Sequence, residues 1–215
     1  MKSPLRFLGY ITGVLVAGIL VYVLCAECLN YDRDTSAKGF TRSELAIMNN
    51  ADSIMRVLTI EDPQDLTVLR SRSHDFSCEA LLSDEFRRFS ELMVATVTHP
   101  SQDGVGIAGP QVGLNRRVVA VQRFDKEGEP FEVYPNISIV WKSDSLAFGP
   151  EGCLSVPDRR GDVARSQEIV IEYTAISSDS DPGLTQVRDT VKGFTAVIFQ
   201  HEVDHLDGIL YIDRL

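Results

Sequence analysis

The pattern of hydrophobic and polar positions predicts a helix close to the end of the chain. It covers residues 190–206, and Gly208 follows as a C-terminal stop. Three apolar residues recur at the spacing of one helical face: Phe194, Val197 and Ile198. His201 and His205 continue the same face. The helix is therefore expected to turn two imidazoles toward the protein interior.

Two further helices are predicted upstream. Residues 83–85 read as a helix start, and the apolar residues that follow line one face: Phe86, Phe89, Met93 and Val97. Thr41 and Glu44 match a capping box that opens a shorter helix. Ordered structure is therefore expected to begin near residue 41.

Alternating and β-branched stretches between these helices predict strands. They lie at residues 117–124, at 132–141 with an interruption at Pro135-Asn136, at 168–176 and at 187–191. Strands that follow one another and are flanked by helices are typical of an α+β fold. We expect antiparallel sheets around a central helix at residues 190–206, rather than a doubly wound parallel sheet.

The N-terminus carries an uncharged apolar run of 20 residues, at positions 7–26. About 20 such residues are needed to cross the hydrocarbon core of a bilayer. Leu24 is a poor −3 residue for cleavage after Ala26 and a poor neighbour for lipid attachment at Cys25. We expect an uncleaved membrane-spanning anchor, with a signal helix as the alternative. The predicted organisation is an anchor or signal segment at residues 1–27, a polar stalk at 28–40 and a folded domain at 41–215.

Composition narrows the classes of function. A chain of 215 residues with 44% hydrophobic content can form one domain with a substantial core. The formal net charge of −10 argues against direct nucleic-acid binding, which needs a basic surface. The four cysteines form no disulfide framework: Cys25, Cys28, Cys78 and Cys153.

The strongest chemical signal is His201-Glu202-Val203-Asp204-His205. Histidines at positions i and i+4 of a helix can share one metal ion, and the intervening carboxylate can reach a water there. The alternative is two core histidines beside a solvated Glu202. A third histidine ligand downstream is excluded at the usual spacing, because Tyr211 occupies that position.

The third ligand is therefore expected upstream, and Cys153 is the candidate. It lies between proline breaks in residues 150–157. A thiolate with two imidazoles suits zinc or iron. The alternative is that Cys153 is a small buried hydrophobic residue, as many free cysteines are.

Three stretches of the chain resemble the signature motifs of the peptide deformylases, in the same order. They are GVGIAGPQ at residues 104–111, EGCLS at 151–155 and QHEVDHLDG at 200–208, within a similarity that covers about residues 55–215. The resemblance implies removal of the formyl group from N-formylmethionyl peptides or nascent chains, with release of formate. Gly109 departs from the family's usual second alanine, which removes one methyl and adds backbone freedom beside Gln111 but removes no reactive group.

The resemblance also implies roles for individual residues. Cys153, His201 and His205 would bind the metal, and Glu202 would transfer protons between water and the leaving amine. Gln111 and the Leu154 backbone N–H would stabilise the oxyanion.

The implied peptide-binding residues are Gly106, Ile107, Gly152 and Arg160. The peptide would lie along Gly106 and Ile107 as an added strand. Of Arg160 and Arg165, one would touch the peptide and the other would pair with Glu151.

The resemblance implies Fe²⁺ as the natural ion, with Zn²⁺, Ni²⁺ or Co²⁺ as substitutes.

The membrane side of the domain is not fixed by charge. The numbers of Lys and Arg residues on the two sides of residues 7–26 are nearly equal, so they do not orient the anchor. Nascent formylated chains and an oxygen-sensitive ferrous–thiolate site favour a domain on the cytoplasmic side over an exported one. Two other functions stay open: a membrane-bound H-E-x-x-H zinc metallopeptidase, and a non-catalytic formyl-peptide-binding module with the same fold.

Overall fold

The structure is a computed structural model, and it describes residues 39–177 and 183–215. The predicted anchor at residues 7–26 and nearly all of the predicted stalk lie outside the described residues. Gly39–Leu215 form one compact unit. Within the two described ranges, no helix is both long enough and apolar enough to cross a membrane.

The described chain is a mixture of helices and antiparallel strands. The helices are α2 (Arg42–Asn49), α3 (Pro63–Leu69), α4 (Cys78–Leu81), α5 (Asp84–Val97) and α6 (Gly193–Leu206), with short 3-10 helices η1 (Gly109–Val112) and η2 (Tyr211–Arg214). The strands are β1 (Gly106–Ala108), β2 (Val118–Gln122), β3 (Phe131–Pro135), β4 (Ser138–Lys142), β5 (Leu146–Cys153), β6 (Val156–Ser166), β7 (Glu168–Ile176) and β8 (Leu184–Lys192).

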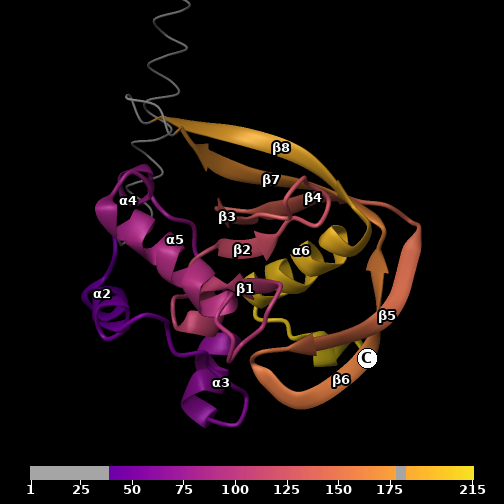
Figure 1. The fold of residues 1–215 in the computed structure, drawn as a ribbon, viewed down its shortest axis with the longest axis horizontal. Coiled ribbons are helices and arrows are strands. Elements are labelled where there is room, and N and C mark those ends of the chain that lie inside the picture. The colour runs from indigo at the N-terminus through magenta and orange to yellow at the C-terminus, as the bar shows by residue number, and fades with distance from the viewer. Residues whose placement is uncertain (1–38, 178–182) are drawn as a thin grey trace, which may run out of the picture. The chain divides into compact units, whose positions relative to one another are not determined.

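The strands form three antiparallel sheets, and α6 lies among them (Figure 1). Two sheets have three strands each, in the orders β1-β2-β3 and β4-β7-β8, and the third is the β5-β6 hairpin. Among the described residues, strand β1 pairs with β2 alone and so lies at the edge of its sheet. The predicted α+β fold, with antiparallel sheets around the helix that carries the histidine motif, is confirmed.

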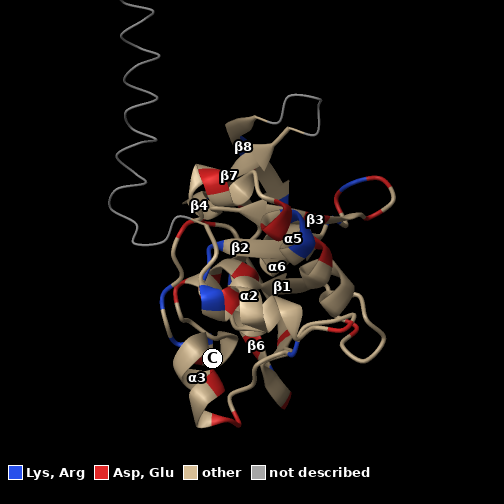
Figure 2. Ribbon diagram, turned by 90° about the vertical axis from the view of Figure 1, so that its left-hand side faces the viewer, with Lys and Arg blue, Asp and Glu red and all other residues tan. Residues whose placement is uncertain are grey.

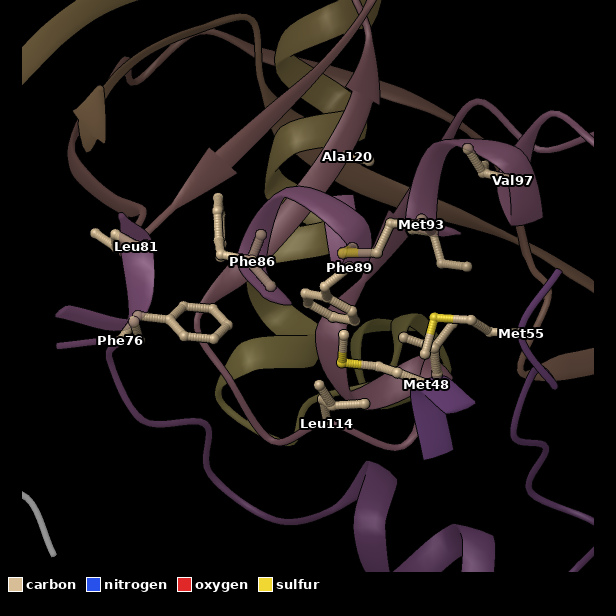
Figure 3. Packing of buried hydrophobic residues seen from close by; sticks show 14 residues of the cluster. Met48, Met55, Phe76, Leu81, Phe86, Phe89, Met93, Val97, Leu114 and Ala120 are labelled. Carbon is tan, nitrogen blue, oxygen red and sulfur yellow. The ribbon is translucent and has the colours of Figure 1, made fainter. Parts of the chain in front are cut away.

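Strand β2 is buried on both faces and separates two hydrophobic clusters. Val118 and Ala120 pack into a cluster with α5, which Figure 3 shows around Phe89. Val119 and Val121 point the other way, into a cluster with α6 and β7. This alternation follows from the two-residue period of a strand. It places α6 on the face of the sheet opposite α5.

The helices at residues 42–49 and 84–97 match the sequence-based expectations. Thr41 caps α2, and its capping box with Glu44 is present. All four predicted face residues of α5 are buried: Phe86, Phe89, Met93 and Val97. Helix α6 instead starts at Gly193, three residues later than predicted, because residues 190–192 are the end of β8.

The predicted strand at residues 132–141 is wrong as a single element. It is two strands in different sheets, β3 and β4, joined at Asn136, which has a positive φ of 53°. The Asn136 side chain accepts from the Phe76 N–H and donates to the Phe76 carbonyl, at 2.7 and 3.0 Å. Asparagine tolerates this left-handed conformation better than most residues. The Pro-Asn interruption thus marks a change of sheet.

The β5-β6 hairpin was not predicted. Strand β5 contains Gly149, Pro150 and Gly152, which weaken any strand pattern in the sequence. The hairpin turns at Leu154 and Ser155, between the two strands, and so carries Cys153 on its first strand.

Acidic and basic positions are interspersed along the described part of the chain (Figure 2). Two buried ion pairs involve this hairpin: Arg165 of β6 pairs with Glu151 of β5 and with Asp204 of α6.

Candidate metal centre and active site

Two elements distant in sequence bring the three candidate ligands together. Helix α6 carries His201 and His205, and the end of β5 carries Cys153. Their ligand atoms all lie within 4.8 Å of one another. The Cys153 Sγ is 3.2 Å from Nε2 of His205. One sulfur and two imidazole nitrogens at these separations fit a single zinc, iron or related divalent ion.

A hydrogen bond on the side of the ring away from the ligand cluster fixes the orientation of His201. Its Nδ1 donates to Oε2 of Glu151 over 2.8 Å, which leaves Nε2 for the centre. Glu151 also accepts two hydrogen bonds from Arg165, at 2.7 and 2.9 Å. Burial opposes ionisation of Glu151, but the bonds from Arg165 and His201 outweigh it and lower its pKa to about 2. Glu151 is thus a fixed anion behind His201.

The pKa values of the two histidines shift in opposite directions. Burial and the neighbouring charge of His201 lower the pKa of His205 well below its usual value. Burial acts the same way on His201, but hydrogen bonds with Cys153 and Glu151 outweigh it and raise its pKa to about 10. Metal binding requires neutral imidazoles and a thiolate, so it releases protons from such a site. One thiolate and two neutral imidazoles therefore suit a divalent cation, which would take the place of the protons that these groups release.

Glu202 is buried and lies beside β1. Its Oε2 has no hydrogen-bond partner among the described residues, and burial raises its pKa to about 7. A Cβ added at Gly106 would lie 2.6 Å from Oε1 of Glu202. Only glycine at position 106 leaves room for this carboxylate. An unpartnered buried carboxyl with such a pKa is suited to accept and release a proton.

Gln111 points its amide nitrogen toward the centre. The Ala108 N–H donates to its Oε1 over 2.8 Å, which fixes the orientation of the amide. Its Nε2 then lies 3.2 Å from Ser155 Oγ and 3.5 Å from Cys153 Sγ. Gln111 is fully buried, so it is not an ordinary turn residue.

The glycine that departs from the family pattern is required by close packing. A Cβ at Gly109 would lie 2.7 Å from the Arg116 carbonyl oxygen and 2.8 Å from that of Leu114. The missing methyl lets backbone carbonyls approach η1, which holds Gln111.

A pocket of about 820 Å³ opens onto these residues. Its lining includes Gly106, Gly152, Leu154 and Arg160, together with Glu202. Arg160 lies against Gly152, where an added Cβ would be 3.7 Å from the arginine Cγ.

Two hydrophobic residues near the pocket differ in burial. Ile107 does not line the pocket, because its side chain is buried in the core, so it can meet a ligand only through its backbone. Phe194 was placed on the buried face of the helix, yet it is 59% exposed and lies at the pocket. It occupies the first turn of α6, where the late start of the helix leaves it uncovered.

Sequence reasoning left the two arginines of the second motif undecided. The structure pairs Arg165 with Glu151 and leaves Arg160 at the pocket. Three other residues at the centre received no role from the sequence. Ser155 contacts Gln111, Tyr211 stacks on His201, and Asp204 binds Arg165. Asp204 lies within the histidine motif, but nothing in its spacing signals its partner.

Comparisons with known proteins agree with one another. The family model described as polypeptide deformylase matches residues 54–215. The peptide deformylase of Leptospira biflexa is 32% identical over 171 residues, covering 76% of this chain and 88% of the relative. Peptide deformylase 2 of Gloeobacter violaceus is 38% identical over 150 residues, covering 69% and 74%.

Solved structures show the same likeness. A class I type b peptide deformylase from Acinetobacter baumannii, with Met-Ala-Ser bound, has a TM-score of 0.64 and 32% identity, covering 77% of this chain and 100% of that one. The enzyme from Thermotoga maritima has a TM-score of 0.62 and 30% identity, covering 75% and 97%.

Proposed function

Because the chain belongs to the peptide deformylase family, we propose that its pocket removes the formyl group from formylmethionyl peptides and releases formate. One observation carries the proposal. Three metal-ligand side chains and an unpartnered carboxyl meet beside the open edge of β1. The bound Met-Ala-Ser of the Acinetobacter enzyme is the kind of product that this reaction would leave.

Cys153, His201 and His205 would hold one divalent cation. When bound, such an ion would polarise a carbonyl oxygen and lower the pKa of water to about 7. The mixed sulfur and nitrogen ligands suit Fe²⁺, Zn²⁺, Co²⁺ or Ni²⁺, and we take Fe²⁺ as the natural ion from the family. A cysteine thiolate can be oxidised, so a ferrous site that depends on the Cys153 thiolate would be sensitive to oxygen.

Glu202 is the proton carrier in this scheme. It takes a proton from the water that attacks the formyl carbon, and delivers it to the amine nitrogen as the C–N bond breaks. Its burial and its pKa of about 7 support both halves of this transfer. Gly106 makes the position possible, since any larger residue would displace the carboxyl.

Two donors would stabilise the negative oxygen of the tetrahedral intermediate. Gln111 Nε2 is aimed at the centre by the Ala108 N–H. The Leu154 N–H belongs to the turn beside Cys153, and the Leu154 side chain packs near Gly104 at the pocket. Losing one donor of this kind typically costs about 3 kcal/mol of barrier.

The peptide would run along β1 as an added strand. The backbone of Gly106 and Ile107 supplies the open edge, because β1 pairs on one side only. Gly152 and Arg160 line the facing wall of the pocket. Arg160 would contact the peptide beyond its methionine.

The full chain should release formate from formyl-Met-Ala under anaerobic conditions and leave acetyl-Met-Ala intact. Casein serves as the second substrate. Casein cleavage without formate release would favour a metallopeptidase, and bound metal without turnover would favour a binding module. Either result would contradict the proposed reaction.

A membrane tether is the second part of the proposal. The uncharged run at residues 7–26 is long enough to span a bilayer. We place the domain on the cytoplasmic side, where formylated nascent chains emerge and the reducing environment protects the thiolate. Alkaline phosphatase fused after Leu215 should be inactive in intact bacteria. Strong phosphatase activity would place the domain outside.

A further inference from the structure

The four-residue helix η2 makes two separate contacts with the ligand system. The Tyr211 ring stacks on the ring of His201, with centroids 6.0 Å apart and an interplanar angle of 22°. At the other end of η2, the Arg214 guanidinium donates twice to Asp204, from Nε and a terminal nitrogen, at 2.5 Å each. Both contacts reach α6 from the same short element.

A continuous line of charged hydrogen bonds leads from Arg214 to His201. Asp204 accepts from Arg214 and also from Arg165, again at 2.5 Å. Arg165 donates twice to Glu151, and Glu151 accepts from Nδ1 of His201 over 2.8 Å. The three inner members of this line, Glu151, Arg165 and Asp204, are all buried. Only Arg214 reaches solvent, with 36% of its side chain exposed.

With His201 as a neutral metal ligand, the charges of Glu151, Arg165 and Asp204 balance only when Arg214 is counted. Two carboxylates, Glu151 and Asp204, share the single buried guanidinium of Arg165. Arg214 supplies the second positive charge and satisfies Asp204. Arg165 is then free to keep its paired hydrogen bonds to Glu151. A buried ion pair that loses one partner is costly, because the remaining charge is left uncompensated.

We infer that Arg214 is a positioning residue for the metal centre, acting through Asp204, Arg165 and Glu151 on His201. Partners of metal-binding histidines fix the ring orientation and raise the basicity of the ligand nitrogen. His201 is the histidine held this way, since Nδ1 of His205 has no hydrogen-bond partner among the described residues. The inference rests on the proposed function only in taking His201 as a ligand.

The test is the affinity of the metal-free full chain for Co²⁺, measured by competition with a chelator. Arg214→Gln should weaken binding roughly tenfold, at the lower end of the range known for outer partners of metal ligands. Arg214→Lys keeps a positive charge near Asp204 but loses the paired hydrogen bonds. The Co²⁺ affinity of this variant should therefore lie between that of the wild type and that of Arg214→Gln. The visible spectrum of the Co²⁺ form should shift in the same order, because it reports ligand geometry.

Two further variants make the test specific. Lys142 is close enough for its charge to act on Asp204, so Lys142→Met combined with Arg214→Gln should weaken binding more than Arg214→Gln alone. Arg188→Gln removes an exposed ion pair between Arg188 of β8 and Glu172 of β7, neither of which lines the pocket, and should leave Co²⁺ affinity unchanged. Melting of each metal-free variant separates lost stability from lost affinity.

Wild-type affinity in all the Arg214 variants would overturn the inference while leaving the proposed function intact. An equal loss in Arg188→Gln would also overturn it, since the effect would then not travel through Asp204. A wild-type chain that binds no metal would contradict the proposed function itself, and the inference with it.

Discussion

Helices α5 and α6 have the same length, 14 residues each, but opposite designs. Helix α5 is amphipathic: Ser83 caps it, acidic residues occupy its first turn, and its buried positions are almost all apolar. Helix α6 has no side-chain cap and is buried from Thr195 to Leu206 apart from Val197. Six of its buried residues are polar or charged: Thr195, Gln200, His201, Glu202, Asp204 and His205.

The difference shows how this fold divides its tasks. Helix α5 stabilises the domain by burying hydrocarbon, as a surface helix does. Helix α6 buries polar groups, and each such group must find a partner or cost free energy. Most have partners, and the exceptions, Glu202 Oε2 and His205 Nδ1, lie at the centre. The unpartnered polar atoms of α6 therefore belong to residues of the proposed site.

The largest expected effect is on α6, and it leaves stability intact. Glu202→Gln should lower turnover by 10²–10⁴-fold, about 3–5 kcal/mol of barrier, because the proton carrier is lost. The amide has nearly the same shape, so metal content and melting should match the wild type. Formate release with metal analysis checks both. More than about a tenth of wild-type turnover would show that another group carries the proton.

The converse is expected on α5. Phe89 is fully buried in the cluster of Figure 3. Phe89→Ala should lower the free energy of unfolding by about 3–5 kcal/mol through lost burial and a cavity. The protein that remains folded should keep its metal and its turnover number. A selective loss of turnover at unchanged stability would break the division between the two helices.

A smaller effect on stability is expected at Gln200 on α6. Its Oε1 accepts from the Ser166 N–H at 3.0 Å, and its Nε2 donates to the carbonyls of Ser166 and Ala196 at 2.8 and 2.9 Å. Gln200→Leu leaves the Ser166 backbone groups buried without these partners. The cost should be about 1–3 kcal/mol in denaturant unfolding. An equal or more stable variant would mean that burial alone holds α6 in place.

The smallest effect is at the start of α5. The Ser83 hydroxyl accepts from the Phe86 N–H at 3.1 Å, and Ser83→Ala should cost about 1 kcal/mol. Lys192, which stands at the same position before α6, makes no side-chain cap. Lys192→Ala should therefore change melting little. Equal losses from both substitutions would remove this contrast between the helices.

The contrast also explains what the sequence could predict. The apolar spacing of Phe86, Phe89 and Met93 defines α5 with little ambiguity, because period and burial agree. For α6, the H-E-x-x-H motif identified His201 and Glu202 as site residues. The apolar spacing, by contrast, predicted a helix start three residues too early and a buried Phe194, which is exposed. A helix buried on all sides has no polar face to set its period.

The rest of the site depends on contacts between distant segments. The β5-β6 hairpin was missed because its glycines and proline hide the strand pattern, although the motif within it pointed to Cys153. The line from Arg214 to His201 joins β5, β6, α6 and η2. Ion pairs of this kind depend on tertiary placement, and residue spacing carries no signal for them. The motifs thus predicted the candidate ligands and Glu202, whereas the ion pairs that position these residues could be identified only from the fold.

The central claim is that Cys153 and two histidines of α6 bind one metal ion. Anaerobic titration of the metal-free full chain with Co²⁺ tests it most directly, because cobalt–thiolate bonds give a strong near-ultraviolet absorption. The wild type should develop this band and saturate at one equivalent per chain, and Cys153→Ser should lack it. An unchanged band in Cys153→Ser, or saturation of the wild type without the band, would contradict the account.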